Sequence, residues 1–205
     1  MIKMGDKFYL IGAGGHTRSL INILESAGLE IGGIYDDNFK DNEVINGYKL
    51  IGKLENIKID DNLILSVGDN RKREKLFYKY YKQIYKERLI HPSAIIEKYV
   101  KIGESNQIFS GVYINSNVEI GNNNILNTKC LIEHDAFIGD HNHVSVGAIL
   151  CGRAAVGNRC FIGAGATVID KVRLCDDVVI GANSVVIEDI RESGIYAGNP
   201  VKKIR

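Results

Sequence analysis

The sequence has no tryptophan, two prolines and two methionines, and it lacks any apolar run long enough to cross a bilayer. A transmembrane helix needs about 18 or more consecutive apolar residues. The apolar stretch at residues 8–11 is also too short for the core of a signal peptide, and Gly12 follows it directly. We therefore expect a cytoplasmic protein with no membrane partner.

An excess of charge of one sign is also missing. The chain carries 26 Lys and Arg against 25 Asp and Glu, a net charge of +1. Such a balance gives no bulk field that would attract nucleic acid. Residues 71–88 are rich in Lys and Arg, with apolar residues at helical spacing. Either a nucleic-acid-binding helix or the solvated face of an amphipathic helix would give this pattern, and the neutral balance favours the second.

Cysteine is scarce and scattered, with four residues and no C-x-x-C pair. This favours free thiols over a disulfide or metal site.

What the sequence does contain is a repeat. Every sixth residue from Ile90 to Val186 is aliphatic, seventeen times in succession, and a small or β-branched residue usually stands two positions earlier. A period of six predicts a hexapeptide β-helix, in which three short strands and three corners make one coil of 18 residues. Residues 90–191 would form between five and six coils, with Gly and Asn at corners that need a positive φ.

The first part of the chain has a different pattern. Residues 8–11, 31–35 and 62–67 are expected to be buried strands, and a glycine-rich loop with an amphipathic helix joins the first two. The fold class expected is therefore an α/β N-terminal Rossmann-like βαβ domain followed by a left-handed parallel β-helix of hexapeptide repeats. The domain boundaries are 1–88 for the first and 89–205 for the second, which includes a C-terminal tail.

The glycine-rich loop suggests a phosphate site. Gly12, Gly14 and Gly15 would expose backbone N–H groups at a helix N-terminus, which attracts anions. Asp36 follows 22 residues after Gly14, where an acid can accept from a ribose hydroxyl. Thr17 replaces the third glycine of the dinucleotide motif, so a nucleotide fits better than a dinucleotide. A tight turn without a ligand is the alternative.

The β-helix carries one candidate for chemistry. His134 lies between Glu133 and Asp135 and two residues after the inward Ile132, so it should point off the prism. Gly152, 18 residues on, should occupy the same corner at the strand spacing of about 4.8 Å. A base beside a backbone N–H that receives an oxyanion is what acyl transfer needs, and either carboxylate could orient the imidazole. A surface histidine bonded to a carboxylate is the simpler alternative.

A metal site is not expected. His134, His141 and His143 occupy three different phases of the hexapeptide, so their imidazoles should not converge on one ion.

Seven segments with recognisable motifs occur in order along the chain: 12–16, 36–38, 67–70, 91–94, 133–135, 143–148 and 196–202. Taken together, they resemble the PglD/NeuD-like family of sugar O/N-acetyltransferases, in its nucleotide-aminosugar N-acetyltransferase branch. The resemblance extends over essentially the whole chain.

The resemblance implies a homotrimer with active sites between subunits, acetyl-CoA as co-substrate along the β-helix, and a nucleotide-linked amino sugar in the N-terminal domain. The residues it implies for the sugar nucleotide are Gly12, Gly14, Gly15, His16, Asp36, Asp37, Gly68 and Asn70. The residues it implies for acetyl-CoA are His143, Gly152, Gly165, Gly198, Asn199, Pro200, Lys202 and Lys203.

His134 would then be the base that deprotonates the attacking amine, in a direct transfer without an acyl-enzyme. Family members often have Glu directly after this His. Asp135 is shorter by one methylene and is expected to need a small shift to reach the ring, so Glu133 is a rival. Cys151 is interpreted as a small neighbour of Gly152 and not as a nucleophile.

The favoured function is N-acetylation of the 4-amino group of a nucleotide-linked 4-amino-4,6-dideoxy sugar, for lipopolysaccharide or capsule synthesis. The nearest alternative is O-acetylation of sialic acid or a related sugar by the same base. A β-helix metalloenzyme of the carbonic anhydrase type and a non-catalytic nucleotide-binding scaffold are further alternatives. The nucleobase and the stereochemistry of the sugar stay open.

Overall fold

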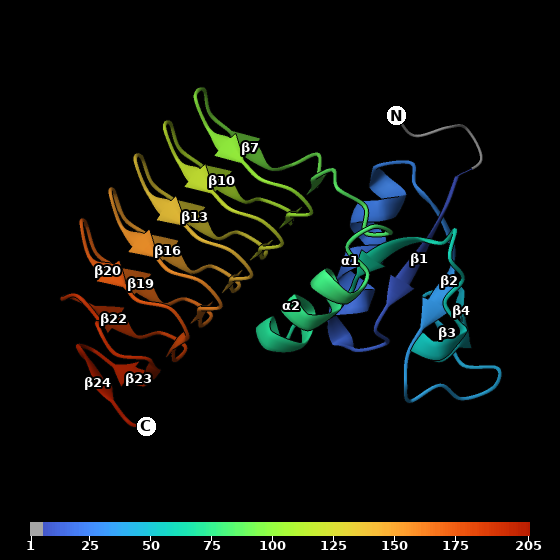
Figure 1. Cartoon of the computed structure of the whole chain (residues 1–205). Coiled ribbons are helices and arrows are strands. Elements are labelled where there is room, and N and C mark those ends of the chain that lie inside the picture. The colour runs from blue at the N-terminus through green and yellow to red at the C-terminus, as the bar shows by residue number, and fades with distance from the viewer. Residues whose placement is uncertain (1–5) are drawn as a thin grey trace. The chain divides into compact units, whose positions relative to one another are not determined.

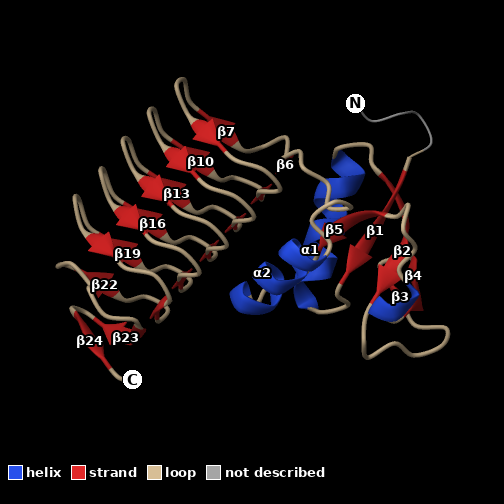
Figure 2. Ribbon diagram, in the orientation of Figure 1, coloured by secondary structure: helices blue, strands red, loops and turns tan. Residues whose placement is uncertain are grey.

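The computed structural model describes residues 6–205, which form two units, one ending at Leu89 and one spanning Ile90–Arg205. The helices of the described residues lie in the first unit, and the second is built of strands and turns (Figure 2). No helix within residues 6–205 is long and apolar enough to cross a membrane.

The first unit is a five-stranded sheet with two helices. Its strand order is β3-β4-β2-β1-β5, and β1 pairs in parallel with both β2 and β5. The strands are β1 (Lys7–Ile11), β2 (Glu30–Tyr35), β3 (Val44–Ile45), β4 (Tyr48–Gly52) and β5 (Asn62–Leu65), and the helices are α1 (Gly15–Ser26), a 3-10 turn (Leu54–Asn56) and α2 (Asn70–Lys79). The three expected strands correspond to β1, β2 and β5, which form the predicted βαβ core.

The sequence interpretation missed the antiparallel hairpin of β3 and β4. Its turn is Asn46-Gly47, with φ of 48° and 89°. Asn-Gly is the strongest short-range signal for a two-residue hairpin because both residues tolerate positive φ.

Helix α2 ends at Lys79 and does not continue to Arg88 as the apolar spacing suggested. The chain beyond it returns beside β5, where the N–H of Leu63 donates to the Gln83 carbonyl at 2.9 Å and the Tyr85 N–H donates to the Leu63 carbonyl at 2.9 Å. The N–H and carbonyl of Leu63 on this side of β5 are thereby satisfied, and Ile84 is buried in the core beside Leu63. Sheet pairing therefore overrides the helical spacing after Lys79.

The second unit is a parallel β-helix with three faces (Figure 1). Face 1 contains β7 (Ile95–Ile96), β10 (Tyr113–Ile114), β13 (Leu131–Ile132), β16 (Ile149–Leu150), β19 (Thr167–Val168) and β22 (Val185–Val186). Face 2 contains β8 (Lys101–Ile102), β11 (Glu119–Ile120), β14 (Phe137–Ile138), β17 (Ala155–Val156) and β20 (Arg173–Leu174). Face 3 contains β6 (Leu89–Ile90), β9 (Gln107–Ile108), β12 (Ile125–Leu126), β15 (His143–Val144), β18 (Phe161–Ile162), β21 (Val178–Ile180), β23 (Gly194–Gly198) and β24 (Val201–Lys203).

Three edges join these faces. The histidine edge leads from face 1 to face 2 and contains His134; the ladder edge leads from face 2 to face 3 and contains Asp140; the glycine edge leads from face 3 to face 1 and contains Gly165. The hexapeptide β-helix and the α/β domain together confirm the predicted fold class.

The aliphatic residue of each hexapeptide forms the core of the prism. From Ile108 to Val186 every one of them is buried. Ile90, Ile96 and Ile102 of the first coil are more exposed, because only the following coil packs against them.

Three asparagines interrupt the series of small residues beside this core. Asn106, Asn124 and Asn142 are fully buried and stacked 18 residues apart. Their side-chain oxygens accept from the backbone N–H of Asn124 at 2.9 Å, of Asn142 at 2.7 Å and of Cys160 at 2.6 Å. The side-chain oxygens of the column thus link successive coils from within, whereas the buried Nδ2 of Asn124 has no acceptor among residues 6–205.

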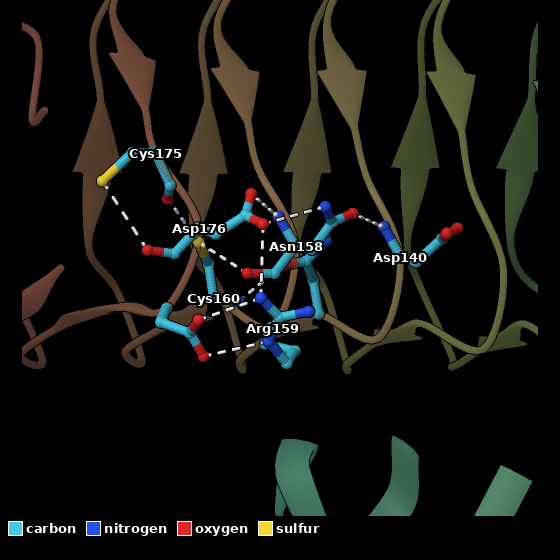
Figure 3. Close-up of polar contacts among 8 residues, drawn as sticks. Asp140, Asn158, Arg159, Cys160, Cys175 and Asp176 are labelled. Atoms are coloured by element: carbon cyan, nitrogen blue, oxygen red, sulfur yellow. Dashed lines mark hydrogen bonds and ion pairs between the residues drawn. The ribbon is translucent and has the colours of Figure 1, made fainter. Parts of the chain in front are cut away.

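A second column of side chains runs along the ladder edge (Figure 3). The N–H of Asn122 donates to Asp140 Oδ1 at 2.6 Å, and the N–H of Asp140 donates to Asn158 Oδ1 at 2.7 Å. The N–H of Asn158 donates in turn to Asp176 Oδ1 at 2.8 Å. A methyl group on Gly139 would lie 2.5 Å from Asn158 Oδ1. Glycine recurs at this edge because each side chain reaches back to the preceding coil.

Candidate active site

The first unit contains a cleft of about 550 Å³ at the carboxyl ends of β1, β2 and β5. This is the edge of a parallel sheet at which α/β proteins bind ligands. Six of the expected sugar-nucleotide residues line it: Gly12, Gly14, Gly15, His16, Asp36 and Gly68. Further lining residues that the sequence interpretation did not single out include Asn38, Lys40, Ser66 and Lys72.

Glycine occurs at the three positions of this loop for different structural reasons. Gly12 has a φ of +112°, and a methyl group there would lie 3.0 Å from the Ser66 carbonyl oxygen, so packing requires glycine. A methyl group on Gly14 or Gly15 would meet no atom within 4 Å. Gly14 and Gly15 therefore leave open space at the N-terminus of α1, where backbone N–H groups and the helix dipole favour an anion.

Asp36 holds this loop in place. Its Oδ2 accepts from the N–H of Ala13 at 2.7 Å, and its Oδ1 accepts from the N–H of Asn38 at 2.8 Å. Each carboxylate oxygen has a second lone pair, so these contacts leave Asp36 able to accept from a ribose hydroxyl.

Asp37 and Asn70 do not line the cleft. Asp37 Oδ1 accepts from the N–H of Leu54 at 3.4 Å, and Asn70 Oδ1 accepts from Arg73 Nη2 at 2.9 Å. Both side chains bond to nearby protein groups. They therefore lie outside the lining of the cleft, in which the sequence analysis expected them.

Arg73 is fully buried beneath the turn at Gly68. Its Nη1 donates to the carbonyls of Val67 and Gly68, both at 3.2 Å. Burial lowers the pKa of Arg73 to about 9, and the charge of Asp69 partly opposes that shift. The guanidinium, still cationic at neutral pH, fixes the cleft wall. Arg73 lies in the first turn of α2, and the interpretation of residues 71–88 as a solvated basic face overlooked its burial.

The second unit contains a His–Asp pair on the histidine edge. His134 Nδ1 lies 2.8 Å from Asp135 Oδ2, and both side chains are about half exposed, at 49% and 48%. This hydrogen bond holds the pKa of Asp135 below its usual range. Since an ionised carboxylate only accepts, Nδ1 carries the proton of this hydrogen bond, and in the neutral ring the lone pair is then on Nε2.

Asp135 needs no shift to reach the ring, contrary to the expectation from its shorter side chain. Its backbone φ of 59° at the corner turns the carboxylate back toward His134. Glu133 instead accepts from Asn115 Nδ2 at 2.6 Å and from the N–H of His134 at 3.4 Å. It touches the backbone of His134 and not the imidazole.

Gly152 lies beside this imidazole, one coil further along. A methyl group on Gly152 would come within 2.7 Å of His134 Nε2 and 3.1 Å of Asp170 Oδ1. Gly152 is buried, and its N–H donates to no acceptor within residues 6–205. A base and an unused backbone donor thus stand together, which suits proton removal and oxyanion binding.

The other histidines lie elsewhere. His141 is on the ladder edge and His143 is on β15 of face 3. Residues 6–205 contain no group of three or more His, Cys, Asp or Glu side chains placed to hold a metal ion.

Most of the expected acetyl-CoA residues follow the glycine edge and its C-terminal end. His143 Nε2 lies 3.2 Å from Asn127 Nδ2 at that edge, and Gly165 lies at the corner after β18. The N–H of Gly198 donates to Ser184 Oγ at 3.0 Å, just beyond the same edge. Asn199 and Pro200 form the turn between β23 and β24, and Lys202 lies on β24. Within one chain, face 1 separates these residues from His134 and Gly152.

Comparison with known proteins gives matches to both units. Residues 7–80 match the family model of the PglD N-terminal domain, and residues 156–188 match the bacterial transferase hexapeptide model. The structure of PerB from Caulobacter crescentus in complex with CoA and GDP-perosamine is 31% identical, with a TM-score of 0.87 and 98% of each chain covered. The chain belongs to the PglD/NeuD-like family of sugar O/N-acetyltransferases.

The chain also matches an acetyltransferase domain and an uncharacterised protein. The acetyltransferase domain of PglB from Neisseria gonorrhoeae is 27% identical, with a TM-score of 0.89, and the match covers 98% of this chain and 100% of that domain. An uncharacterised protein, L142, of Acanthamoeba polyphaga mimivirus is 35% identical over 109 residues, which is 50% of this chain and 22% of that protein's length. As a PglD/NeuD-like protein with hexapeptide repeats, the chain is an acyltransferase, as the sequence predicted.

Proposed function

We propose that this protein transfers the acetyl group of acetyl-CoA to the 4-amino group of a nucleotide-linked 4-amino-4,6-dideoxy sugar, in the cytoplasm, for cell-surface glycan synthesis. The pairing of His134 with Gly152 carries this proposal, because it provides both a base and an oxyanion donor. The similarity to PerB, whose structure holds CoA and GDP-perosamine, supports the two substrate classes.

The cleft of the first unit would hold the nucleotide. Gly14 and Gly15 offer open backbone at the start of α1 for the diphosphate, and Lys40 and Lys72 add positive charge at the cleft wall. Asp36 would accept from the ribose, and His16 would approach the diphosphate or the sugar.

In the second unit, the amine nitrogen would attack the thioester carbonyl carbon. His134 Nε2 takes the proton from the amine while Asp135 holds the Nδ1–H and stabilises the imidazolium. The N–H of Gly152 donates to the oxyanion of the tetrahedral intermediate. The C–S bond then breaks, and the proton on His134 passes to the departing thiolate to give CoA.

The active site is proposed to lie between subunits of a homotrimer. Gly152 and His134 occupy the histidine edge, whereas His143 and Gly165 lie toward the glycine edge, so one prism alone separates the base from the coenzyme residues. The outer face of face 1 between these edges is mainly apolar. Its outward residues are Ile95, Tyr113, Leu131, Ile149, Thr167 and Val185. Such a stripe suits packing against another copy.

Mass spectrometry of reaction products tests the proposal. The wild-type chain and His134→Ala would be incubated with acetyl-CoA and UDP-, dTDP- or GDP-linked 4-amino sugars, or with free or CMP-linked sialic acid. One amino sugar gaining a single acetyl group only with intact His134 is the expected result. Acetylation of sialic acid alone would assign the protein to the O-acetyl branch, and full activity of His134→Ala would remove the base from the mechanism.

A further inference from the structure

The backbone N–H groups of the histidine edge have different hydrogen-bond acceptors in successive coils. The N–H of Ser116 donates to Oδ1 of the preceding residue, Asn115, at 2.7 Å. One coil on, the N–H of His134 donates to Oε2 of Glu133 at 3.4 Å. At both corners the residue before the N–H supplies the side-chain oxygen that accepts it.

The next coil has Cys151 at this position, before Gly152. A thiol is a weak acceptor, and burial raises the pKa of Cys151, so the group stays a neutral thiol at physiological pH. Gly152 is buried, and its N–H meets no acceptor among the described residues 6–205. Buried backbone donors without an acceptor are rare and call for an explanation.

The following coil shows that the lack of an acceptor is not sufficient by itself. Ile169 also has no side-chain oxygen, but Asp170 after it is exposed, so water can accept from its N–H. Among the histidine-edge corners within residues 6–205, Gly152 alone combines a missing acceptor with burial and with the neighbouring imidazole of His134.

We infer that Cys151 is a positioning residue that keeps the Gly152 N–H available by offering it no oxygen acceptor. This inference rests on the proposed function, in which that N–H receives the oxyanion. Asn or Asp at position 151 would accept from the N–H as Asn115 does for Ser116, and the oxyanion would then compete with a built-in acceptor.

Steady-state kinetics of Cys151→Asn and Cys151→Ala test the inference. The fold should accept asparagine here, because Asn115 occupies the same corner position two coils earlier. Cys151→Asn should lower kcat at least about tenfold, toward the roughly 10²–10³-fold cost of losing one oxyanion donor. The KM values and the melting temperature should stay close to those of the wild type. Cys151→Ala adds no acceptor, so its kcat should stay close to that of the wild type.

Ile169→Asn is the matched control, because it adds the same acceptor one coil on and leaves Gly152 untouched. Cys151→Asp provides a second acceptor should the asparagine variant fold poorly. A kcat of Cys151→Asn equal to that of the wild type would overturn the inference. So would an equal loss in Cys151→Ala, since the thiol itself would then be needed.

Hydrogen exchange at the Gly152 amide, followed by NMR, provides a readout independent of turnover. The amide should exchange more slowly in Cys151→Asn than in Cys151→Ala, because only asparagine captures the proton. Unchanged exchange would overturn the inference about Cys151. Slower exchange, in a protein whose wild type acetylates no acceptor, would instead reject the proposed function.

Discussion

The imidazole of His134 lies so close to the backbone of Gly152 that a methyl group on that glycine would come within 2.7 Å of Nε2. Gly152 does not have the positive φ that is found at the corner glycines Gly111, Gly147 and Gly165. Its lack of a side chain is therefore explained by the neighbouring ring. The position of the His134 imidazole thus depends on the absence of a side chain at Gly152, 18 residues further along the sequence.

Gly152→Ala should consequently abolish most activity while leaving the fold intact. The added methyl would push the half-exposed imidazole off Gly152, and the loss of a general base costs about 10²–10⁴-fold in rate. Acetylation kinetics and a melting curve measure the two effects. Ser116→Ala, at the same corner position two coils earlier, is the control. Retention of full activity by Gly152→Ala would contradict the role of this pair.

Asp135→Asn should lower kcat by about 10- to 100-fold, because the carboxylate fixes the tautomer of His134 and stabilises the imidazolium. Glu133→Gln should have a smaller effect, since Glu133 contacts Asn115 and the backbone of His134. Comparison of the two kcat values is the measurement, with Asp135→Glu as a charge-preserving control. A larger loss in Glu133→Gln would make Glu133 the orienting acid.

The same substitution at two glycines of the cleft loop should give opposite results. Gly12→Ala forces a residue with a side chain into a φ of +112°, so the free energy of unfolding should fall by about 1–3 kcal/mol. Gly14→Ala clashes with no protein atom and should leave the melting temperature unchanged. It should weaken binding of GDP, UDP or dTDP about tenfold or more, because its methyl occupies the space at the helix N-terminus. Calorimetric titration and thermal unfolding distinguish these outcomes. Equal nucleotide affinity of Gly14→Ala and wild type would exclude Gly14 from the nucleotide site.

Mixing two impaired variants should restore activity when the site is shared between copies. His134→Ala damages the histidine edge and His143→Asn alters face 3 beside the glycine edge, so each alone should be nearly inactive. In a trimer refolded from a 1:1 mixture, roughly one quarter of the interfaces should combine two intact edges. The activity of the mixture is compared with that of each variant, and native mass spectrometry gives the oligomeric state. A mixture no more active than its components would put the site within one chain.

The four cysteines should differ sharply in reactivity. Burial raises the pKa of Cys160 to about 12 and raises that of Cys130 still further, so at pH 8 only about 10⁻⁴ of Cys160 is thiolate. In the native protein, an aromatic disulfide reagent should modify neither of these two, and the partly exposed Cys151 and Cys175 should react slowly. All four should react in urea. Fast modification of Cys160 in the native state would contradict its burial.

The raised pKa of Cys160 also predicts a loss of stability at alkaline pH. A thiol with a pKa of 9.0 when unfolded and about 12 when folded favours the folded state fully below pH 9. That stabilisation is lost as the pH rises from about 9 to 12. Cys160→Ala should flatten the fall in melting temperature over this range. An unchanged slope would exclude Cys160 as its source.

The β-helix could be predicted from sequence because its core admits one aliphatic side chain per hexapeptide, from Ile108 to Val186 without a break. That strict period also predicted that Gly152 would lie beside His134. The choice of Asp135 over Glu133 was left open, because it depends on the hydrogen-bond partners that each carboxylate finds at the corner: His134 Nδ1 for Asp135, and Asn115 Nδ2 for Glu133. The buried Asn106, Asn124 and Asn142 were overlooked because polar residues replaced the expected small ones.

The first unit was less predictable because its contacts are not periodic. Arg73 lies in a run of basic residues, and only the packing of α2 decides which of them is buried. Nor could composition reveal that Asn70 would turn toward Arg73, since its partner depends on the same packing. Residue types therefore indicated the position of the cleft but not every side chain that lines it.

The ladder edge has a consequence for how the protein is made. Within residues 6–205, the N–H of Asn122 donates to Asp140 and that of Asp140 donates to Asn158, so each coil depends on a side chain 18 residues further along. A ribosome releases the chain from its N-terminus, and every new coil must therefore wait for the next to emerge before its hydrogen bonds are complete. Growth of the prism during translation should lag by one coil throughout. The prism is complete when the β23–β24 hairpin pairs with β21.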